Sequence, residues 1–265
     1  MKRTLLLAGA GVLFGIYAFF IEPVWLEVSI HSNGRNAASP LITVAQLSDL
    51  HLHDIGRRER AVMAEISRLQ PDLLILSGDV LDRPDTLPLL EIFLAGTSAK
   101  HVIATAGNWE YWGEVDMNAL RTVYEKHGAS LLVNREEIFE LKGRKVRVTG
   151  LDDFTAGQPR DELLDSPSNA DISILVEHSP GFFESPKVTK RVMEAKHFNL
   201  CLAGHTHAGQ LTLFGWPLWT PPGSGSFVSG WYETAVCTTY ISRGLGTSVL
   251  PARFFARPEI AVFEL

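Results

Sequence analysis

The sequence predicts an α/β fold with two packed β-sheets flanked by helices, an αββα sandwich. Short apolar runs of four to seven residues are typical of buried strands. Up to residue 128 these runs alternate with segments whose apolar residues recur at helical spacing, which favours a mostly parallel sheet covered by helices. The last third of the chain is rich in strand-like runs and in Gly- and Pro-dense loops such as 221–225.

The first half of the chain alternates strands and helices. Each expected helix carries apolar residues on one face, and Pro71 and Gly128 end two of them. Proline disfavours a helical residue before it, and glycine adopts the left-handed conformation at a helix end. The expected strands cover 41–47, 73–76 and 101–106, and the expected helices cover 57–70, 86–95 and 117–127.

A hairpin and further α/β units follow in the second half. The polar run 142–145 lies between two strand-like segments, which predicts a hairpin turn. Asp152 and Asp153 follow the second of these segments, and we interpret them as turn or capping residues. The expected strands cover 137–140, 146–151, 172–176 and 200–203, and a helix is expected over 187–197.

Five of the apolar runs end in Asp, Asn or His. His205 and His207 can share one face, because alternate side chains of an extended strand point the same way. Gly204 before them lets the backbone turn closely. Asp49 and His51 repeat the same spacing. The polar groups that follow the five runs are Asp49-Leu50-His51, Gly78-Asp79, Gly107-Asn108-Trp109-Glu110, Glu177-His178 and Gly204-His205-Thr206-His207.

The side chains at these strand ends are metal ligands by type. In open α/β sheets, ligands bind at the carboxyl ends of the strands, so we expect the five groups to converge. Imidazole, carboxylate and amide groups without a thiolate suit Mn, Fe, Zn or Co. The sequence therefore predicts a metal site with mixed oxygen and nitrogen ligands.

These motifs, in this order, resemble the signature of the calcineurin-like metallophosphoesterases, which is D-x-H, G-D, G-N-H-(D/E), H and G-H-x-H. The resemblance covers residues 42–265, nearly the whole chain after its N-terminal segment. It implies the four-layer αββα sandwich of that family. Three closing segments, 205–210, 240–248 and 257–260, resemble the membrane-linked bacterial branch of the family.

The resemblance implies two divalent metal ions, which we expect to be Mn, Zn or Fe. In the family the two ions clamp the attacking and leaving oxygens, and a metal-bridging hydroxide attacks phosphorus. We predict that Asp79, Asn108 and His178 are catalytic as well as metal-binding. For any one of these residues alone, a turn, cap or structural role is the alternative. The implied ligands are Asp49, His51 and His207 for the first metal, Asn108, His178 and His205 for the second, and Asp79 as the bridge.

Trp109 departs from the family motif, which has histidine at this position. That histidine contacts the phosphate and helps to protonate the leaving oxygen, whereas an indole has no accessible proton to give. One outcome is a substrate whose leaving group needs no proton, such as a nucleoside monophosphate leaving from a pyrophosphate. Another is that His53 or His101 supplies the proton, and a third is a chain that binds metal and phosphate with little turnover.

The first outcome is preferred, because the family's lipid-precursor pyrophosphatases replace this histidine with arginine and remain active. We therefore expect Trp109 to line the substrate site. Folding of residues 109–112 over the core is the alternative.

The charge and the cysteine content restrict the class of protein. A net charge of −6, with no run of Lys or Arg, argues against a nucleic-acid-binding surface. Cys201 and Cys237 lie in apolar strand-like runs, which favours buried free thiols. A disulfide between them requires that the two strands be neighbours.

The N-terminal segment predicts a membrane anchor. An uncharged run over 4–21 follows Lys2-Arg3, and its 18 residues are just long enough for a spanning helix. The positive-inside rule places the N-terminus in the cytoplasm and the catalytic domain outside it. A cleaved signal peptide is the alternative. We expect a single-pass protein of the cell membrane, with a transmembrane signal anchor over 1–23, a linker over 24–40 and a metallophosphoesterase domain over 41–265.

A cluster of aromatic and apolar residues follows the histidines of the last motif. We expect residues 214–232 to form an apolar lip that admits an acyl chain or enters a bilayer. Packing of these side chains onto the domain is the alternative. The residues concerned are Phe214, Trp216, Leu218, Trp219, Phe227 and Trp231.

Together these features predict a membrane-anchored, dimetal phosphoesterase. The expected substrate is a phosphodiester or a pyrophosphate that is linked to a lipid or to the cell envelope, such as a UDP-diacylglucosamine-type precursor. The oligomeric state stays open. The alternative, which Trp109 favours, is a metal- and phosphate-binding membrane protein with little catalysis.

Overall fold

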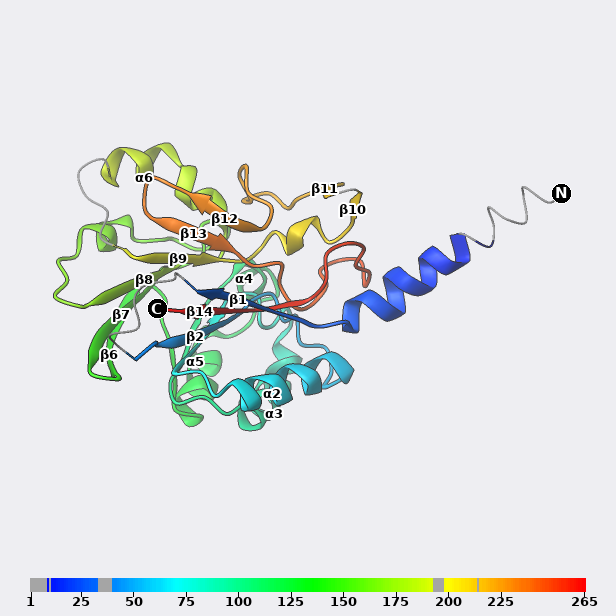
Figure 1. The fold of residues 1–265 in the computed structure, drawn as a ribbon, viewed down its shortest axis with the longest axis horizontal. Coiled ribbons are helices and arrows are strands. Elements are labelled where there is room, and N and C mark those ends of the chain that lie inside the picture. The colour runs from blue at the N-terminus through cyan, green and yellow to red at the C-terminus, as the bar shows by residue number, and fades with distance from the viewer. Residues whose placement is uncertain (1–8, 10, 33–39, 193–197, 214) are drawn as a thin grey trace.

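Two six-stranded β-sheets pack face to face in the protein (Figure 1). The computed structural model describes residues 9, 11–32, 40–192, 198–213 and 215–265. Helices cover the outer face of each sheet, so the described chain has four layers in the order αββα. A small hairpin of β10 (Thr212–Leu213) and β11 (Trp216–Pro217) lies outside these layers.

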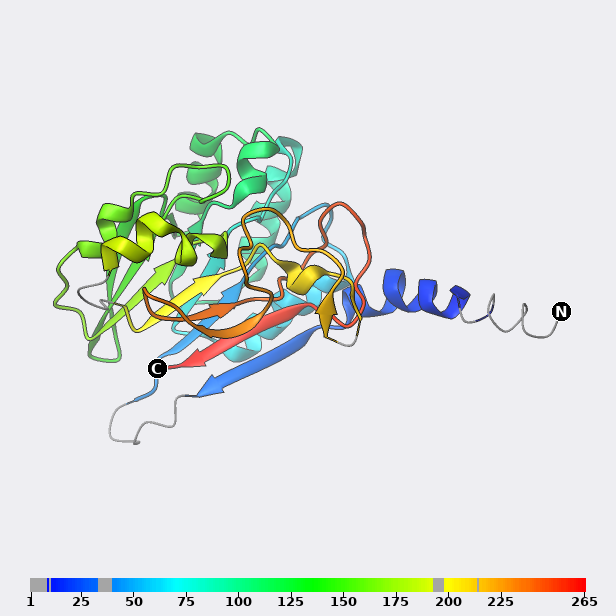
Figure 2. The ribbon, with the colours of Figure 1, turned by 90° about the horizontal axis from the view of Figure 1, so that it is seen from above.

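The first sheet has the strand order β1-β14-β2-β3-β4-β5. The strands from β2 to β5 are parallel neighbours, whereas β14 is antiparallel to β2 and parallel to β1. Figure 2 shows β1 in blue beside β14 in red. The strands are β1 (Glu27–Ser32), β2 (Thr43–Leu47), β3 (Leu73–Ser77), β4 (Val102–Thr105), β5 (Ala129–Leu131) and β14 (Glu259–Glu264).

The second sheet has the strand order β12-β13-β9-β8-β7-β6. Its centre, from β7 to β13, is parallel, and an antiparallel strand closes each edge. The strands are β6 (Arg135–Leu141), β7 (Arg144–Gly150), β8 (Ile172–Val176), β9 (Leu200–Ala203), β12 (Gly230–Glu233) and β13 (Thr238–Ile241).

Three apolar layers hold the sheets and helices together. Residues such as Val44, Ile75 and Val148 fill the space between the sheets. On the outside of the first sheet, α2 (Arg57–Leu69), α3 (Leu87–Gly96) and α5 (Met117–Lys126) bury their apolar faces, and α6 (Pro186–Arg191) does so on the second. The short helices are η3 (Pro84–Thr86), α4 (Asn108–Trp112), η4 (Asp161–Asp165), η5 (Pro180–Glu184) and η7 (His207–Gly209).

The expected strands and helices of the core are present, with boundaries that differ by a few residues. Periodicity identified these elements because central strands buried on both faces are nearly continuous apolar runs. The expected helix over 187–197 is α6 up to Arg191, and residues 193–197 lie outside the described residues. Within the expected linker 24–40, residues 27–32 form β1, while 33–39 lie outside the described residues.

The predicted transmembrane anchor, and with it the single-pass location in the cell membrane, is contradicted. Among the described residues, no helix has both the length and the apolar character needed to cross a membrane. The described helical stretch in this segment covers residues 11–16 and continues through η1 (Tyr17–Ile21). Residues 1–8 and 10, which belong to the expected anchor, lie outside the described residues.

One face of this helical stretch packs on the protein itself. Ala18 is buried, and the rings of Phe14 and Tyr17 lie 4.7 and 5.9 Å from the ring of Phe254. After η1 the chain turns through η2 (Glu22–Val24) into β1.

The two cysteines form a disulfide, so the prediction of free thiols is wrong. Cys201 lies in β9 and Cys237 immediately precedes β13, its parallel neighbour, and the two Cα atoms are 6.1 Å apart. Both residues are buried, as predicted. The sequence could not establish the bond because it depends on which strands are neighbours.

Candidate metal centre

The seven predicted ligands lie together at the carboxyl ends of strands in the two sheets. All seven are buried, with side chains that come from both sides of the sandwich. Convergence of strand ends from two packed sheets therefore produces one compact polar site. The contributions are Asp49 and His51 after β2, Asp79 after β3, Asn108 after β4, His178 after β8, and His205 and His207 after β9.

Left-handed backbone conformations are concentrated at these residues. Non-glycine residues rarely adopt a positive φ, and such strain collects at functional sites. Five of the seven predicted ligands have φ between 45° and 70°. The fold thus holds them in conformations that their local sequence does not favour. They are Asp49 (54°), His51 (45°), Asp79 (52°), His205 (70°) and His207 (50°).

Two glycines of the motifs are required by close packing. A Cβ atom on Gly204 would lie 1.8 Å from Oγ of Ser48 and 2.5 Å from Oδ2 of Asp49. A Cβ atom on Gly107 would lie 2.3 Å from Oδ1 of Asp79. Any larger residue at either position would push a predicted ligand out of place.

The first group of predicted ligands comprises Asp49, His51 and His207. One ligand atom from each lies within 4.8 Å of the others, as expected for donors around one ion. The Nε2 atoms of His51 and His207 are 3.3 Å apart, and Nε2 of His207 is 3.4 Å from Oδ1 of Asp49. Both oxygens of Asp49 accept from the backbone N–H of His205, which connects this group to the next.

The second group comprises Asp79, His178 and His205, with Asn108 beside them. The three titratable residues again have ligand atoms within 4.8 Å of one another. Nδ1 of His205 lies 2.7 Å from Oδ1 of Asn108. Oδ2 of Asp79 lies 3.1 Å from Nε2 of His178 and 3.9 Å from Nε2 of His51 in the first group. Asp79 therefore lies between the two groups.

The chemistry of the donors fits a cation at this place. Nδ1 of His178 donates to the carbonyl oxygen of Ser77 at 2.7 Å, and its buried Nε2 faces Oδ2 of Asp79. A histidine whose orientation is set by a backbone carbonyl in this way presents its other nitrogen to a metal. Burial lowers the pKa of His178, but the carboxylates of Asp79, Asp49 and Asp153 together raise it well above its ordinary value. Positive charge is thus favoured at this point.

Two of the other three buried imidazoles of the site are held neutral. Burial, with the neighbouring His178, lowers the pKa of His205, and burial with His51 lowers that of His207 well below its ordinary value. Neutral imidazole is the form that binds metals.

Sequence reasoning missed two carboxylates that support the ligands. Glu110 accepts hydrogen bonds from the backbone N–H groups of Asp79, Val80, Leu81 and Gly107. Its place in the Gly107-Asn108-Trp109-Glu110 motif was an available signal. Asp82 lies 3.6 Å from Nδ1 of His51, on the side away from the other ligands, and sequence alone carries no comparable signal for it.

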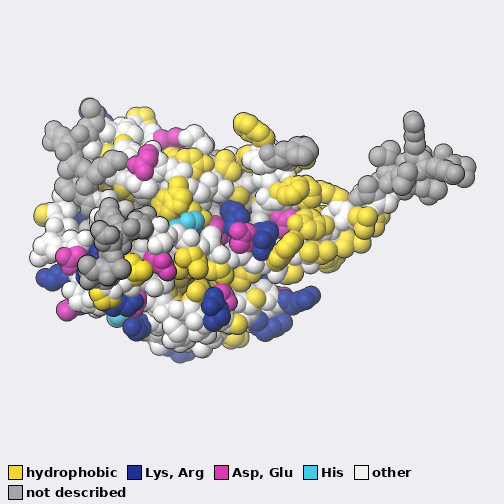
Figure 3. All heavy atoms as spheres, viewed as in Figure 1, with side chains coloured by type: hydrophobic (Ala, Val, Ile, Leu, Met, Phe, Trp, Pro, Cys, Tyr) yellow, Lys and Arg dark blue, Asp and Glu magenta, His cyan; other side chains and the backbone are white. Residues whose placement is uncertain are grey.

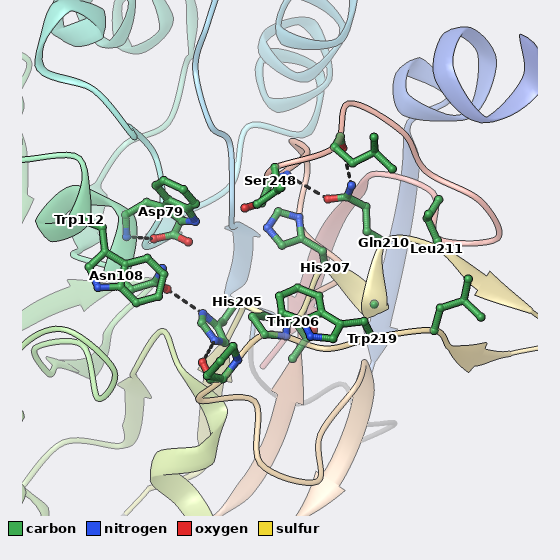
Figure 4. A pocket seen from close by; sticks show the side chains of 17 residues that line it. Asp79, Asn108, Trp112, His205, Thr206, His207, Gln210, Leu211, Trp219 and Ser248 are labelled. Atoms are coloured by element: carbon green, nitrogen blue, oxygen red, sulfur yellow. Dashed lines mark hydrogen bonds between the residues drawn. The ribbon is translucent and has the colours of Figure 1, made fainter. Parts of the chain in front are cut away.

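A cavity of about 490 Å³ opens directly onto the ligands (Figure 4). Asp79, Asn108, His205 and His207 form the floor of this cavity, which we call the cavity floor. Most of the residues in the walls of the cavity are apolar. We call their exposed part the apolar rim: Trp112, Leu218, Trp219, Val249 and Leu250, with exposed fractions between 41% and 90%.

Trp109 lines this cavity beside Trp112, with ring centroids 5.7 Å apart, and its backbone N–H donates to Oδ1 of Asp79 at 2.8 Å. The two residues proposed to replace the family histidine do not line the cavity. His53 has a 54% exposed side chain and bonds Asp82 at 2.6 Å, while His101 packs on Phe139.

Some residues of the aromatic segment 214–232 are exposed, as expected for an apolar lip, and others pack onto the domain. Trp216, Leu218 and Trp219 are exposed, and the last two lie in the apolar rim. Phe227 is buried in the domain and Trp231 packs against His31, so these two follow the alternative. Phe214 lies outside the described residues.

The turn role predicted for Asp152 and Asp153 is confirmed. Asp153 accepts from the backbone N–H groups of Thr155 and Ala156, and Asp152 accepts from that of Gln158.

Comparison with known proteins agrees with this geometry. The family model of the calcineurin-like phosphoesterases matches residues 42–209. The chain belongs to the calcineurin-like phosphoesterase family. It is 33% identical to the uncharacterized metallophosphoesterase YkuE of Bacillus subtilis, over 98% of this chain and 91% of that one. It is 27% identical to the phosphodiesterase YaeI of Escherichia coli, over 94% of this chain and 92% of that one.

Among solved structures, the NAD nucleotidase of Haemophilus influenzae has the same fold, with a TM-score of 0.51 and 14% identity over 78% of this chain and 46% of that one. As a calcineurin-like phosphoesterase the protein is a metal-dependent hydrolase that uses two divalent metal ions. Trp109 remains the position at which it departs from the family motif.

Proposed function

We propose that the protein hydrolyses a phosphodiester or a pyrophosphate that carries a lipid-like apolar group. The observation that carries this proposal is the position of two ligand groups, joined by Asp79, on the floor of a cavity with apolar walls. The relative YaeI is named a phosphodiesterase, which supports the choice of bond.

The seven predicted residues fit two ions, with Asp79 between them. Two such ions, when bound, lower the pKa of water and polarise the phosphoryl oxygen. Asn108 and His178 act with Asp79 at the reacting centre. The residues of this proposed site are Asp49, His51 and His207 for the first ion, and Asn108, His178 and His205 for the second.

Trp109 points to the kind of leaving group. The residue lines the cavity but has no proton to give to a leaving oxygen. A leaving group that is stable as an anion, such as the phosphate of a pyrophosphate, needs no such proton. Trp109 in this proposal is a wall of the substrate site that contacts the leaving or the apolar group.

The apolar rim supports a substrate that carries an acyl or prenyl chain. Its exposed apolar side chains line the same cavity as the floor residues. A membrane surface is then the natural partner that presents the substrate, and a UDP-diacylglucosamine-type precursor is one candidate. The net charge of −6 disfavours a nucleic acid as the substrate.

Hydrolysis of bis(p-nitrophenyl) phosphate by the full chain with Mn²⁺ tests the proposal. The full chain is needed because β1 is a strand of the first sheet. Turnover that disappears in Asp79→Asn, but not in the exposed control Asp85→Asn, is the expected result. Absence of turnover in protein that has bound Mn²⁺ would contradict general phosphodiester hydrolysis.

A further inference from the structure

A loop after β13 crosses directly over the first group of ligands. Within this loop, the backbone N–H of Leu245 donates to the carbonyl of Ser48 at 2.9 Å, and that of Gly246 donates to the carbonyl of Asp49 at 2.6 Å. At Gly244, with φ of 68°, a Cβ atom would lie only 2.8 Å from Cβ of Asp49. The loop therefore rests on the backbone that carries Asp49.

Arg253 lies between this loop and His207, another residue of the first group. Its side chain is fully buried. Four hydrogen bonds run from the guanidinium to the carbonyls of Gly246, which accepts two, Arg243 and Ala256. Its Nη2 atom also lies 3.3 Å from Nδ1 of His207, on the ring edge opposite the Nε2 atom that faces Asp49. One side chain thus spans from the Asp49 strand end to His207.

The guanidinium of Arg253 carries a fixed charge on a rigid planar group. The planar guanidinium also offers five donors in fixed directions, which a lysine ammonium cannot do.

The N-terminal segment holds the part of the loop that carries Arg253. The backbone N–H of Arg253 donates to the carbonyl of Ala18 at 2.9 Å. The carboxylate of Glu22, which is fully buried, accepts from the backbone N–H groups of Phe255 and Ala256 at 3.0 and 2.5 Å. Figure 4 shows the N-terminal helix close to the loop that carries Ser248 at the cavity.

We propose that Arg253 is a positioning residue for the first metal site, and that Glu22 and Ala18 of the N-terminal segment hold it in place. This inference rests on the two-metal site of the proposed function. It makes the N-terminal segment part of the active-site architecture. The same loop carries Ser248, Val249 and Leu250 of the cavity wall, and Gln210 bonds this wall through the N–H of Ser248 and the carbonyl of Leu250.

The contacts of Arg253 and Glu22 predict how much Mn²⁺ affinity is lost when each residue is replaced. A guanidinium can only donate, so it cannot accept the Nδ1–H of a His207 that binds a metal through Nε2. Arg253 acts instead through Gly246, whose carbonyl it holds and whose N–H donates to the carbonyl of Asp49. Loss of a group that supports a metal ligand typically lowers metal affinity roughly 10- to 100-fold. Arg253→Lys keeps the charge but loses the paired hydrogen bonds to Gly246 that hold the loop on Asp49, so we expect a loss of Mn²⁺ affinity in that range. Glu22→Gln keeps one acceptor oxygen and acts one step further away, so we expect a smaller loss in the same direction.

The test is a titration of metal-free full-length protein with Mn²⁺, by calorimetry, beside the thermal stability of the metal-free form. Arg147→Lys is the matched control. Arg147 is as buried as Arg253, donates to the carbonyl of Ser166 and lies over the ring of Phe198, with no contact to a predicted ligand. We expect weaker Mn²⁺ binding for Arg253→Lys and Glu22→Gln, and unchanged binding for Arg147→Lys. Equal Mn²⁺ affinity in Arg253→Lys and Arg147→Lys, with stability alone reduced, would overturn the proposal.

Hydrogen exchange in the unmodified protein gives a second test that needs no variant. We expect Mn²⁺ to slow the exchange of the amides of Arg253, Phe255 and Ala256, because binding at one site and order at the other are reciprocally coupled. Unchanged exchange at these amides on saturation with Mn²⁺ would contradict the coupling. Both tests measure metal binding, so a protein that binds Mn²⁺ as described but fails to hydrolyse phosphodiesters would refute the proposed function alone.

Discussion

The cavity floor and the apolar rim are a few side chains apart, yet they are built by opposite means. The floor residues are at most 4% exposed and are held by hydrogen bonds and left-handed backbone. The rim residues are up to 90% exposed, and most of them belong to loops. A group that must hold a metal needs a fixed position, whereas an apolar group that selects a substrate needs mainly exposed area. We therefore assign the chemistry to the floor and the selection of substrate to the rim.

The largest expected effect comes from the floor. Asp79→Asn removes the carboxylate that lies between the two ligand groups, and we expect kcat for bis(p-nitrophenyl) phosphate to fall by several orders of magnitude. Steady-state kinetics with circular dichroism as a check on folding measures it. Activity within tenfold of the unmodified protein would show that the floor does not perform the chemistry.

Metal binding is expected to stabilise the fold through the floor. Binding to the native state alone adds about 2.7 kcal/mol at a free metal concentration of about 100 times Kd. Addition of Mn²⁺ should therefore raise Tm in thermal unfolding. The increase should be much smaller in His178→Ala, which lacks a ligand of the second group, and an equal increase in both proteins would place the stabilising ion elsewhere.

Trp109 lines the cavity close to the floor. Its replacement distinguishes an active hydrolase, in which Trp109 is a wall of the substrate site, from a metal- and phosphate-binding protein with little catalysis. We expect Trp109→His to lower kcat/KM for bis(p-nitrophenyl) phosphate about tenfold, because a fitted apolar wall is lost and this leaving group needs no proton. If the substitution instead creates activity where the unmodified protein has none, the chain is a metal- and phosphate-binding protein.

The smallest expected effect comes from a single rim residue. Trp219→Ala removes one exposed aromatic side chain of the rim. We expect KM to rise roughly tenfold for a phosphodiester with a dodecyl group, with kcat and the KM of the methyl analogue unchanged. If kcat instead fell by the same factor for both substrates, the rim would also be needed to hold the residues of the cavity floor in place.

The sequence predicted the floor much better than its surroundings. All seven residues predicted as ligands lie close together, because each follows an apolar run and parallel strands bring such ends to one edge of a sheet. Arg253 carries no comparable local signal, since its role arises only when the chain places it between Gly246 and His207. The left-handed backbone of the ligands is likewise imposed by the fold.

The same distinction explains the errors in the fold. Central strands were recognised as apolar runs, whereas β1 has an intermediate or exposed pattern and forms by pairing with β14, far along the chain. The disulfide also depends on which strands become neighbours. The anchor was predicted from hydropathy alone, which counts apolar residues but does not reveal that Phe14 and Tyr17 pack on Phe254.

The most direct test of the division between floor and rim uses p-nitrophenyl alkyl phosphodiesters, with the alkyl group varied from methyl to dodecyl, on the full-length protein with Mn²⁺. The leaving group is the same throughout, so only contacts to the alkyl chain vary. We predict that KM falls steadily as the chain lengthens while kcat stays nearly constant. A KM that does not depend on chain length would contradict the assignment of substrate selection to the apolar rim.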